Sequence, residues 1–126
     1  MKEYKMNLNP LALAYIGDAY FELCVRNYLI EQKLVKVNDL NKNAIKYVSA
    51  NSQARSLEKL LNENILTESE LEIVKRARNH KVNHKPKNTD IVTYHHATAL
   101  EALIGYLYVS EDMERLNKLI EYIIGD

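Results

Sequence analysis

Two carboxylates stand out in this sequence of 126 residues because each lies in an otherwise apolar stretch. Asp18 lies within Ile16-Gly17-Asp18-Ala19-Tyr20, and Glu101 lies within Ala99-Leu100-Glu101-Ala102-Leu103. We expect both to be buried. Removing an unpaired carboxylate from water is costly, so buried acids are usually neutralised, ion-paired or bound to a metal ion. One divalent cation shared by Asp18 and Glu101 would satisfy both.

A basic segment precedes the stretch that contains Glu101, and it contains no acidic residue. Its cationic residues are Lys75, Arg76, Arg78, Lys81, Lys85 and Lys87, with His80 and His84 among them. A run of like charges is usually solvated surface. Beside a metal-binding acid, however, such cations suit a phosphodiester substrate, because they hold the backbone while the metal acts on one phosphate. Lys81 and Lys87 are the first candidates for phosphate contacts, followed by Arg78, Asn79 and Lys85.

Two further groups of residues are weaker metal candidates. Glu22 lies four residues after Asp18, on the same helical face, and could reach the ion, although a surface or ion-paired Glu is commoner. The histidine pairs are disfavoured as zinc ligands, because no cysteine accompanies them and the first pair lies in a predicted loop. These pairs are His80 with His84 and His95 with His96.

The elements that position these residues are predicted to be helices. Three glycines, two prolines and no alternating apolar pattern favour an all-α chain. Asn9-Pro10 predicts a helix running to about residue 32. Asn38 is expected to cap a second long helix that reaches about residue 61, and Thr67 with Glu70 predicts a capping box for a third.

The remaining pattern predicts a loop and two more helices. The loop covers about residues 79–90. A fourth helix is expected to begin between Thr89 and Thr93 and to carry Glu101, and Ser110 is expected to cap the last helix. Gly17 and Gly105 are interpreted as close-packing points between helices, since neither lies in a glycine-rich loop.

Composition limits the organisation and setting of the chain. Its length suits one domain, residues 1–126, with its own core. Seventeen basic and seventeen acidic residues balance, so any affinity for nucleic acid must be local. A lone cysteine, Cys24, fits a reducing cytoplasm. Charges within the apolar stretches exclude a membrane span, and the polar N-terminus does not resemble a secretory signal.

Two segments carry a family resemblance. Leu13-Ala14-Tyr15-Ile16-Gly17-Asp18-Ala19 resembles the signature helix of the ribonuclease III family, and Ala99-Leu100-Glu101-Ala102-Leu103-Ile104-Gly105 resembles its second catalytic helix. Together with Arg78-Asn79 and Pro86-Lys87-Asn88-Thr89-Asp90, they make nearly the whole chain similar to the Mini-III subfamily. That subfamily consists of the catalytic domain without an appended double-stranded-RNA-binding domain, for which this sequence leaves no room.

The resemblance implies an all-α, homodimeric endoribonuclease that cuts double-stranded RNA, leaving 5′-phosphate and 3′-hydroxyl ends. It implies Mg²⁺, with Mn²⁺ as a substitute, and assigns Asp18 and Glu101 as catalytic, metal-binding residues. Two positions depart from the wider family, because Ala14 and Thr98 stand where further acids are common. The Mini-III subfamily shares this loss of acids. The implied substrate is precursor large-subunit ribosomal RNA in the cytoplasm, with a large-subunit ribosomal protein as a possible partner.

Two alternatives belong to other functional classes. One is a catalytically silent relative that binds structured RNA as a ribosome-assembly factor, but such a binder would gain nothing from two buried acids. The other is a helical dimerisation module, which leaves the basic segment unexplained. Salt-dependent RNA binding would separate this module from the other two.

Overall fold

The computed structural model describes residues 8–33, 36–80 and 90–125, and within these ranges the regular structure is entirely α-helical. The six helices are α2 (Pro10–Glu31), α3 (Val37–Val48), α4 (Ala50–Asn62), α5 (Glu68–Arg78), α6 (Ile91–Val109) and α7 (Met113–Ile124). The all-α prediction is therefore confirmed. None of the helices in the described part is long and apolar enough to cross a membrane.

Helix α2 begins and ends close to where the sequence predicts. The Asn9 side chain accepts a hydrogen bond from the amide of Ala12 at 2.9 Å, and Pro10 occupies the first helical position. The helix ends at Glu31, and Lys33 beyond it has φ of 66°, the left-handed conformation common after helices.

The second predicted helix is in fact two. Residues 37–62 break at Ser49, whose extended backbone ends α3 and whose hydroxyl accepts a hydrogen bond from the amide of Ser52, so that it caps α4. The prediction that Asn38 caps this segment is also wrong, because Lys36 is the N-cap residue and Asn38 lies inside the first turn. The break therefore comes from a capping serine, without glycine or proline.

The later helices have the predicted order with one different cap. Thr67 and Glu70 form the predicted capping box of α5, and Asp90 caps α6 within the expected range. Asp112, and not Ser110, caps α7. Ser110 is the C-cap residue of α6, and the chain then turns through Glu111, whose φ is 63°.

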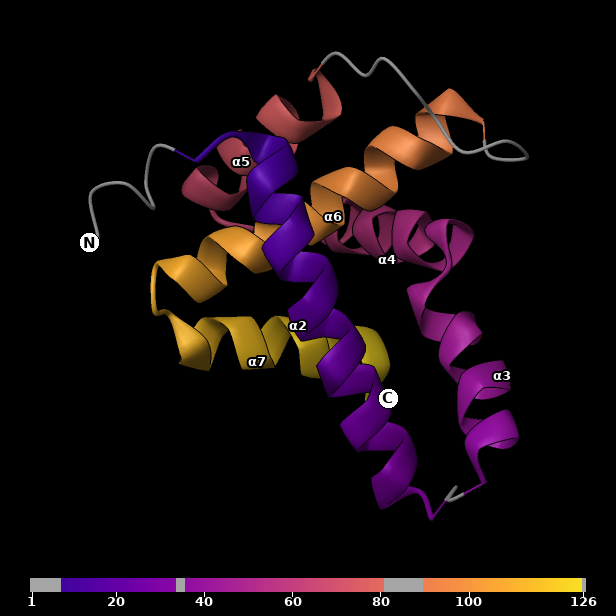
Figure 1. Ribbon diagram of the computed structural model, residues 1–126. Helices are drawn as coiled ribbons and strands as arrows, with labels where there is room; N and C mark the ends of the chain where they lie inside the picture. Colours follow the sequence, from indigo (N-terminus) through magenta and orange to yellow (C-terminus); the bar gives the residue numbers. More distant parts are fainter. Residues whose placement is uncertain (1–7, 34–35, 81–89, 126) are drawn as a thin grey trace.

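Helices α2 and α6 cross at the centre of the molecule and make the most extensive contact between any two helices (Figure 1). Helices α4 and α5 also pack on α6, while α3 packs beside α2. The shared core contains fully buried side chains from most of these helices, including Phe21, Val25, Leu57, Leu60, Val74, Leu100, Leu103, Ile104 and Leu116. The two helices predicted to carry the acids are thus held against each other.

Candidate active site

Two glycines bring the backbones of α2 and α6 into direct contact. A Cβ atom added at Gly17 would collide with the carbonyl oxygen of Glu101 and would lie 2.7 Å from the backbone nitrogen of Gly105. A Cβ atom added at Gly105 would collide with the carbonyl oxygen of Leu13. The interpretation of both glycines as close-packing points is confirmed. Asp18 follows Gly17 directly, so this contact fixes its position relative to Glu101.

The side chains of Asp18 and Glu101 meet at this crossing. Glu101 is half-buried, and its side chain is hydrogen-bonded with that of Asp18. Burial, this hydrogen bond and the charge of Asp18 together raise the pKa of Glu101 from 4.5 to about 8, although a hydrogen bond from Gln53 acts in the opposite direction. The site is therefore a pair of carboxyl groups that strongly resists carrying two negative charges.

The expectation that both acids are buried is wrong for Asp18, which is exposed. Helix α2 is apolar over most of its circumference, so the sequence does not show which side faces the core. In the structure, Leu13, Gly17 and Phe21 line the buried side. Asp18, next to Gly17, lies at the edge of that side with access to solvent. The pair thus has one open and one more enclosed member.

Gln53 is a residue of this site that the sequence analysis missed. It lies on α4, is only 2% exposed, and donates from Nε2 to Oε2 of Glu101 at 3.4 Å and to the carbonyl oxygen of Val48 at 3.0 Å. Its position in the polar run Asn51-Ser52-Gln53 gives no indication that it is buried, and it is 48 residues from Glu101. Only the packing of α4 on α6 reveals it.

Glu22 lies near Asp18 but has an ion-pair partner. Its Oε1 atom is 2.9 Å from the guanidinium of Arg26, one turn further along α2. Glu22 and Asp18 also line one surface hollow of about 500 Å³, together with apolar side chains of α2 and with Tyr108. Its assignment as a metal ligand stays a prediction.

The two positions that depart from the wider family are both buried. Ala14 and Thr98 are each 6% exposed, and neither side chain has a carboxylate that could join the pair. Across residues 8–33, 36–80 and 90–125, no three His, Cys, Asp or Glu side chains gather in a way that could hold a metal ion. Among the described residues, Asp18 and Glu101 are the two carboxylates that interact at the crossing, with Gln53 behind Glu101.

The predicted RNA-binding residues fall partly within the described residues. Arg78 is the last residue of α5 and is partly exposed, and Asn79 is the exposed C-cap residue. Lys81, Lys85 and Lys87 lie outside the described residues. The last turn of α5 therefore carries the described part of the basic segment immediately before the chain continues to α6.

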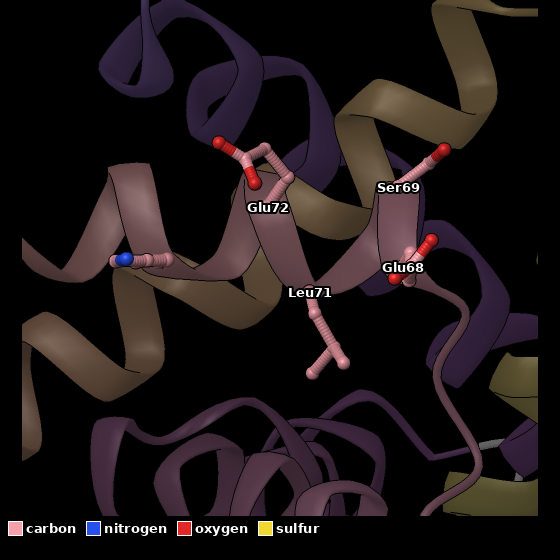
Figure 2. Close-up of a pocket in the computed structure, with 5 residues that line it drawn as sticks. Glu68, Ser69, Leu71 and Glu72 are labelled. Carbon is pink, nitrogen blue, oxygen red and sulfur yellow. The ribbon is translucent and has the colours of Figure 1, made fainter.

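A second hollow, of about 520 Å³, is lined by residues of α5 alone and contains none of the predicted site residues (Figure 2). Its lining comprises Glu68, Ser69, Leu71, Glu72 and Lys75. Two acids in this lining make it a poor surface for an RNA backbone. The chemistry-bearing residues therefore lie at the helix crossing and not in this hollow.

Comparison with known proteins identifies the family. Residues 11–112 match the family model described as the ribonuclease III domain. This range contains Asp18, Gln53 and Glu101. The structure superposes with a TM-score of 0.83 on the crystal structure of a protein from Fusobacterium nucleatum, at 35% identity and with 94% of each chain covered. The chain belongs to the ribonuclease III family, which is a family of endoribonucleases.

Curated relatives place the chain within one branch of this family. It is 51% identical to Mini-ribonuclease 3 of Brevibacillus brevis, covering 90% of this chain and 83% of the relative. It is 45% identical to Mini-ribonuclease 3 of Streptococcus pneumoniae, with 93% and 91% covered, and 47% identical to that of Staphylococcus aureus, with 93% and 87% covered. The resemblance to the Mini-III subfamily is confirmed.

Proposed function

We propose that this chain is a divalent-metal-dependent endoribonuclease that cleaves double-stranded RNA to 5′-phosphate and 3′-hydroxyl ends. The observation that carries the proposal is the pairing of Asp18 with Glu101 at the glycine crossing of α2 and α6. Within residues 8–33, 36–80 and 90–125, no cationic side chain forms an ion pair with either carboxyl group. Two acids held together in this way are a costly arrangement for a purely structural role.

The chemistry of the donor set fits Mg²⁺, with Mn²⁺ as a substitute. Hard cations prefer carboxylate oxygens and keep several waters, so two protein ligands suffice when the substrate phosphate supplies further oxygens. When bound, Mg²⁺ would supply the Lewis acidity that activates water and offsets the charge that develops on the phosphate. The raised pKa of Glu101 supports the assignment, because a nearby cation would offset both like charges.

The residues of the site differ in exposure and therefore in their proposed roles. Asp18 is exposed and would be accessible to an RNA phosphate, whereas Glu101 is more enclosed and accepts a hydrogen bond from Gln53. Glu22 is a candidate ligand through an intervening water, which requires it to share its carboxylate with Arg26. The close backbone contact at Gly17 and Gly105 holds together the two helices that carry the acids.

Binding of the RNA backbone is assigned to the basic segment. Arg78 and Asn79 at the end of α5, followed by Lys81, Lys85 and Lys87, would contact phosphates and ribose hydroxyls. Duplex RNA is recognised mainly by shape and by such contacts. As the Mini-III resemblance implies, the proposed natural substrate is precursor large-subunit ribosomal RNA in the cytoplasm, with a large-subunit ribosomal protein as an accessory partner.

A homodimer would cover the exposed apolar side of α2. Tyr15 is 83% exposed, and Leu11 and Leu23 are 39% and 53% exposed, an apolar surface that extends to Asp18 through the shared hollow. Two copies would present two sites to one duplex, one for each strand. Sedimentation should show a dimer at micromolar concentration and a monomer for Leu23→Asp, and a monomeric wild type would contradict the dimer.

The deciding experiment compares cleavage of a labelled duplex and of its single strand, with Mg²⁺ or EDTA. Wild type should cut only the duplex and only with Mg²⁺. Asp18→Asn should lower the rate at least about 100-fold, since metal-ion catalysis contributes several kcal/mol. Asp39→Asn, an exposed acid on α3, is the matched control and should retain activity. Salt-sensitive duplex binding without cleavage would favour the silent RNA-binding alternative.

A further inference from the structure

We propose that Gln53 is a positioning residue that presents Glu101 to the divalent cation. The inference rests on the proposed function and concerns a residue that itself touches neither RNA nor the reacting atoms. It follows from three features: the break between α3 and α4, the orientation of the Gln53 amide, and an amide oxygen that has no hydrogen-bond partner.

The break at Ser49 creates the anchor for Gln53. In a continuous helix the carbonyl of Val48 would accept from the amide of Ser52, but that amide donates to the Ser49 hydroxyl at 3.2 Å. The carbonyl of Val48 accepts instead from Nε2 of Gln53 at 3.0 Å. The Gln53 side chain is thereby fixed to the main chain at the point where α3 ends.

The orientation of the Gln53 amide follows from its partners. Nε2 has two hydrogens, and it faces two acceptors, the carbonyl oxygen of Val48 and Oε2 of Glu101. The opposite orientation would place Oε1 against both acceptors, which is repulsive. Gln53 therefore donates to the carboxylate of Glu101 and leaves the other carboxylate oxygen available to a cation.

This arrangement is not the most stable one for an apolar interior. Oε1 of Gln53 is buried and has no hydrogen-bond partner among the residues that the structure describes. An unsatisfied buried polar atom is destabilising, and an apolar side chain of similar shape would avoid it. A residue that costs stability while it contacts a catalytic acid is typical of a functional position.

The test uses Gln53→Met, which keeps the shape of the side chain but removes the donor, and Gln53→Leu as a second apolar variant. Ser52→Ala is the matched control, because Ser52 is the neighbouring buried residue and its hydroxyl accepts hydrogen bonds from Ser49 and Arg55. Mn²⁺ binding is measured directly by electron paramagnetic resonance in the absence of RNA. Duplex cleavage is then measured against Mg²⁺ concentration and against RNA concentration, and thermal unfolding is followed without metal.

Both Gln53 variants should bind Mn²⁺ about 10-fold more weakly and need about 10-fold more Mg²⁺ for half-maximal cleavage, the usual effect of losing a residue that orients a ligand. Their half-saturating RNA concentration should stay close to wild type, and their unfolding temperature without metal should be at least as high as that of wild type, because the unsatisfied amide oxygen is gone. If a folded Gln53 variant binds Mn²⁺ as tightly as wild type, and wild type cuts duplex RNA, the role of Gln53 is overturned and the proposed function stands. Failure of the wild type to bind Mn²⁺ and to cut duplex RNA would overturn the proposed function as well.

Discussion

At the scale of single residues, Glu101 links the stability of the protein to its active site. Its pKa is raised from 4.5 to about 8 by burial and by Asp18. The folded protein therefore holds this proton more tightly than the unfolded chain does. The stability contributed by the protonated group is fully present below about pH 4.5 and is lost as the pH rises through about 8.

This linkage gives a prediction for Glu101→Gln. Without a divalent cation, the variant should be more stable than wild type above about pH 8, by at most about 1.4 kcal/mol per unit of pKa shift, and the difference should vanish near about pH 4. Denaturant unfolding at several pH values measures it. Added Mg²⁺ should stabilise wild type and leave the variant unchanged. Equal pH dependence of the two proteins would refute the linkage.

That Asp18 and Glu101 interact could be predicted from the sequence, but their surroundings could not. Asp18 and Glu101 stand out because charge is rare in apolar stretches. The exposure of Asp18 depends on which side of an almost uniformly apolar helix meets α6. Gln53 is in contact with Glu101 only because α4 packs on α6, and no local pattern encodes a contact between helices so distant in the sequence.

At the scale of helices, the glycine crossing is the contact that the site depends on most. Gly17→Ala or Gly105→Ala would force α2 and α6 apart, because the obstructing atoms belong to the backbone and cannot rotate away. Each substitution should destabilise the protein by about 3 kcal/mol or more and abolish cleavage. Gly125→Ala, at the C-cap of α7, is the control, because the nearest atom to its added Cβ is the carbonyl oxygen of Glu121 in the same helix, at 2.7 Å, so no contact between two helices is involved. Thermal unfolding that is the same in all three variants would contradict this account.

A second inter-helix contact joins α5 to α7. Glu70 is 3% exposed and accepts two hydrogen bonds of 2.8 Å from Arg115, whose guanidinium also reaches the carbonyl oxygen of Ile65 at 2.7 Å. Burial alone would raise the pKa of Glu70, but the hydrogen bonds and charge of Arg115, with the amide of Thr67, hold it below its ordinary value. This pair fixes the start of α7 against α5.

Removing the cation should leave Glu70 buried and unpaired. Arg115→Met is expected to destabilise the protein by about 3 kcal/mol near neutral pH. The stabilisation from Glu70 is present above about pH 4.5 and is lost as the pH falls through its lower folded-state pKa, so the deficit should shrink in acid. Lys118→Met removes an exposed α7 ion pair and should cost no more than about 0.5 kcal/mol. Similar urea midpoints for both variants would show that the buried pair is unimportant.

Helix existence could largely be predicted from the sequence, whereas three helix boundaries, at Lys36, Ser49 and Asp112, could not. Asn9-Pro10 and the Thr67 capping box are local signals, and both are used as expected. The break at Ser49 has no glycine or proline to mark it, and Ser110 and Asp112 are equally good caps by residue type. Such choices are decided by which boundary lets each apolar face reach the core.

At the scale of the whole molecule, binding of RNA should depend on local and not on net charge. The formal net charge is zero, so there is no overall attraction for a polyanion. The basic segment must then supply most of the salt-dependent binding. Lys81→Ala and Lys87→Ala, each in the inactive Asp18→Asn background, should lower the slope of log affinity against log salt by about 1 for any duplex sequence.

A matched lysine on another surface distinguishes this effect from a change in overall charge. Lys42→Ala, exposed on α3, removes the same charge and should leave the slope unchanged. Fluorescence anisotropy with two unrelated duplexes measures all three variants. Equal slopes in Lys42→Ala, Lys81→Ala and Lys87→Ala would place the RNA contacts elsewhere.

The contact between Gly17 and Gly105 also determines when during synthesis the enzyme can become active. The two acids come from opposite ends of the chain and meet only when α6 closes onto α2. A nascent chain that has emerged only as far as α5 carries Asp18 without its partner. A ribosome making this protein therefore exposes no nuclease beside its own RNA until α6 has left the exit tunnel and folded.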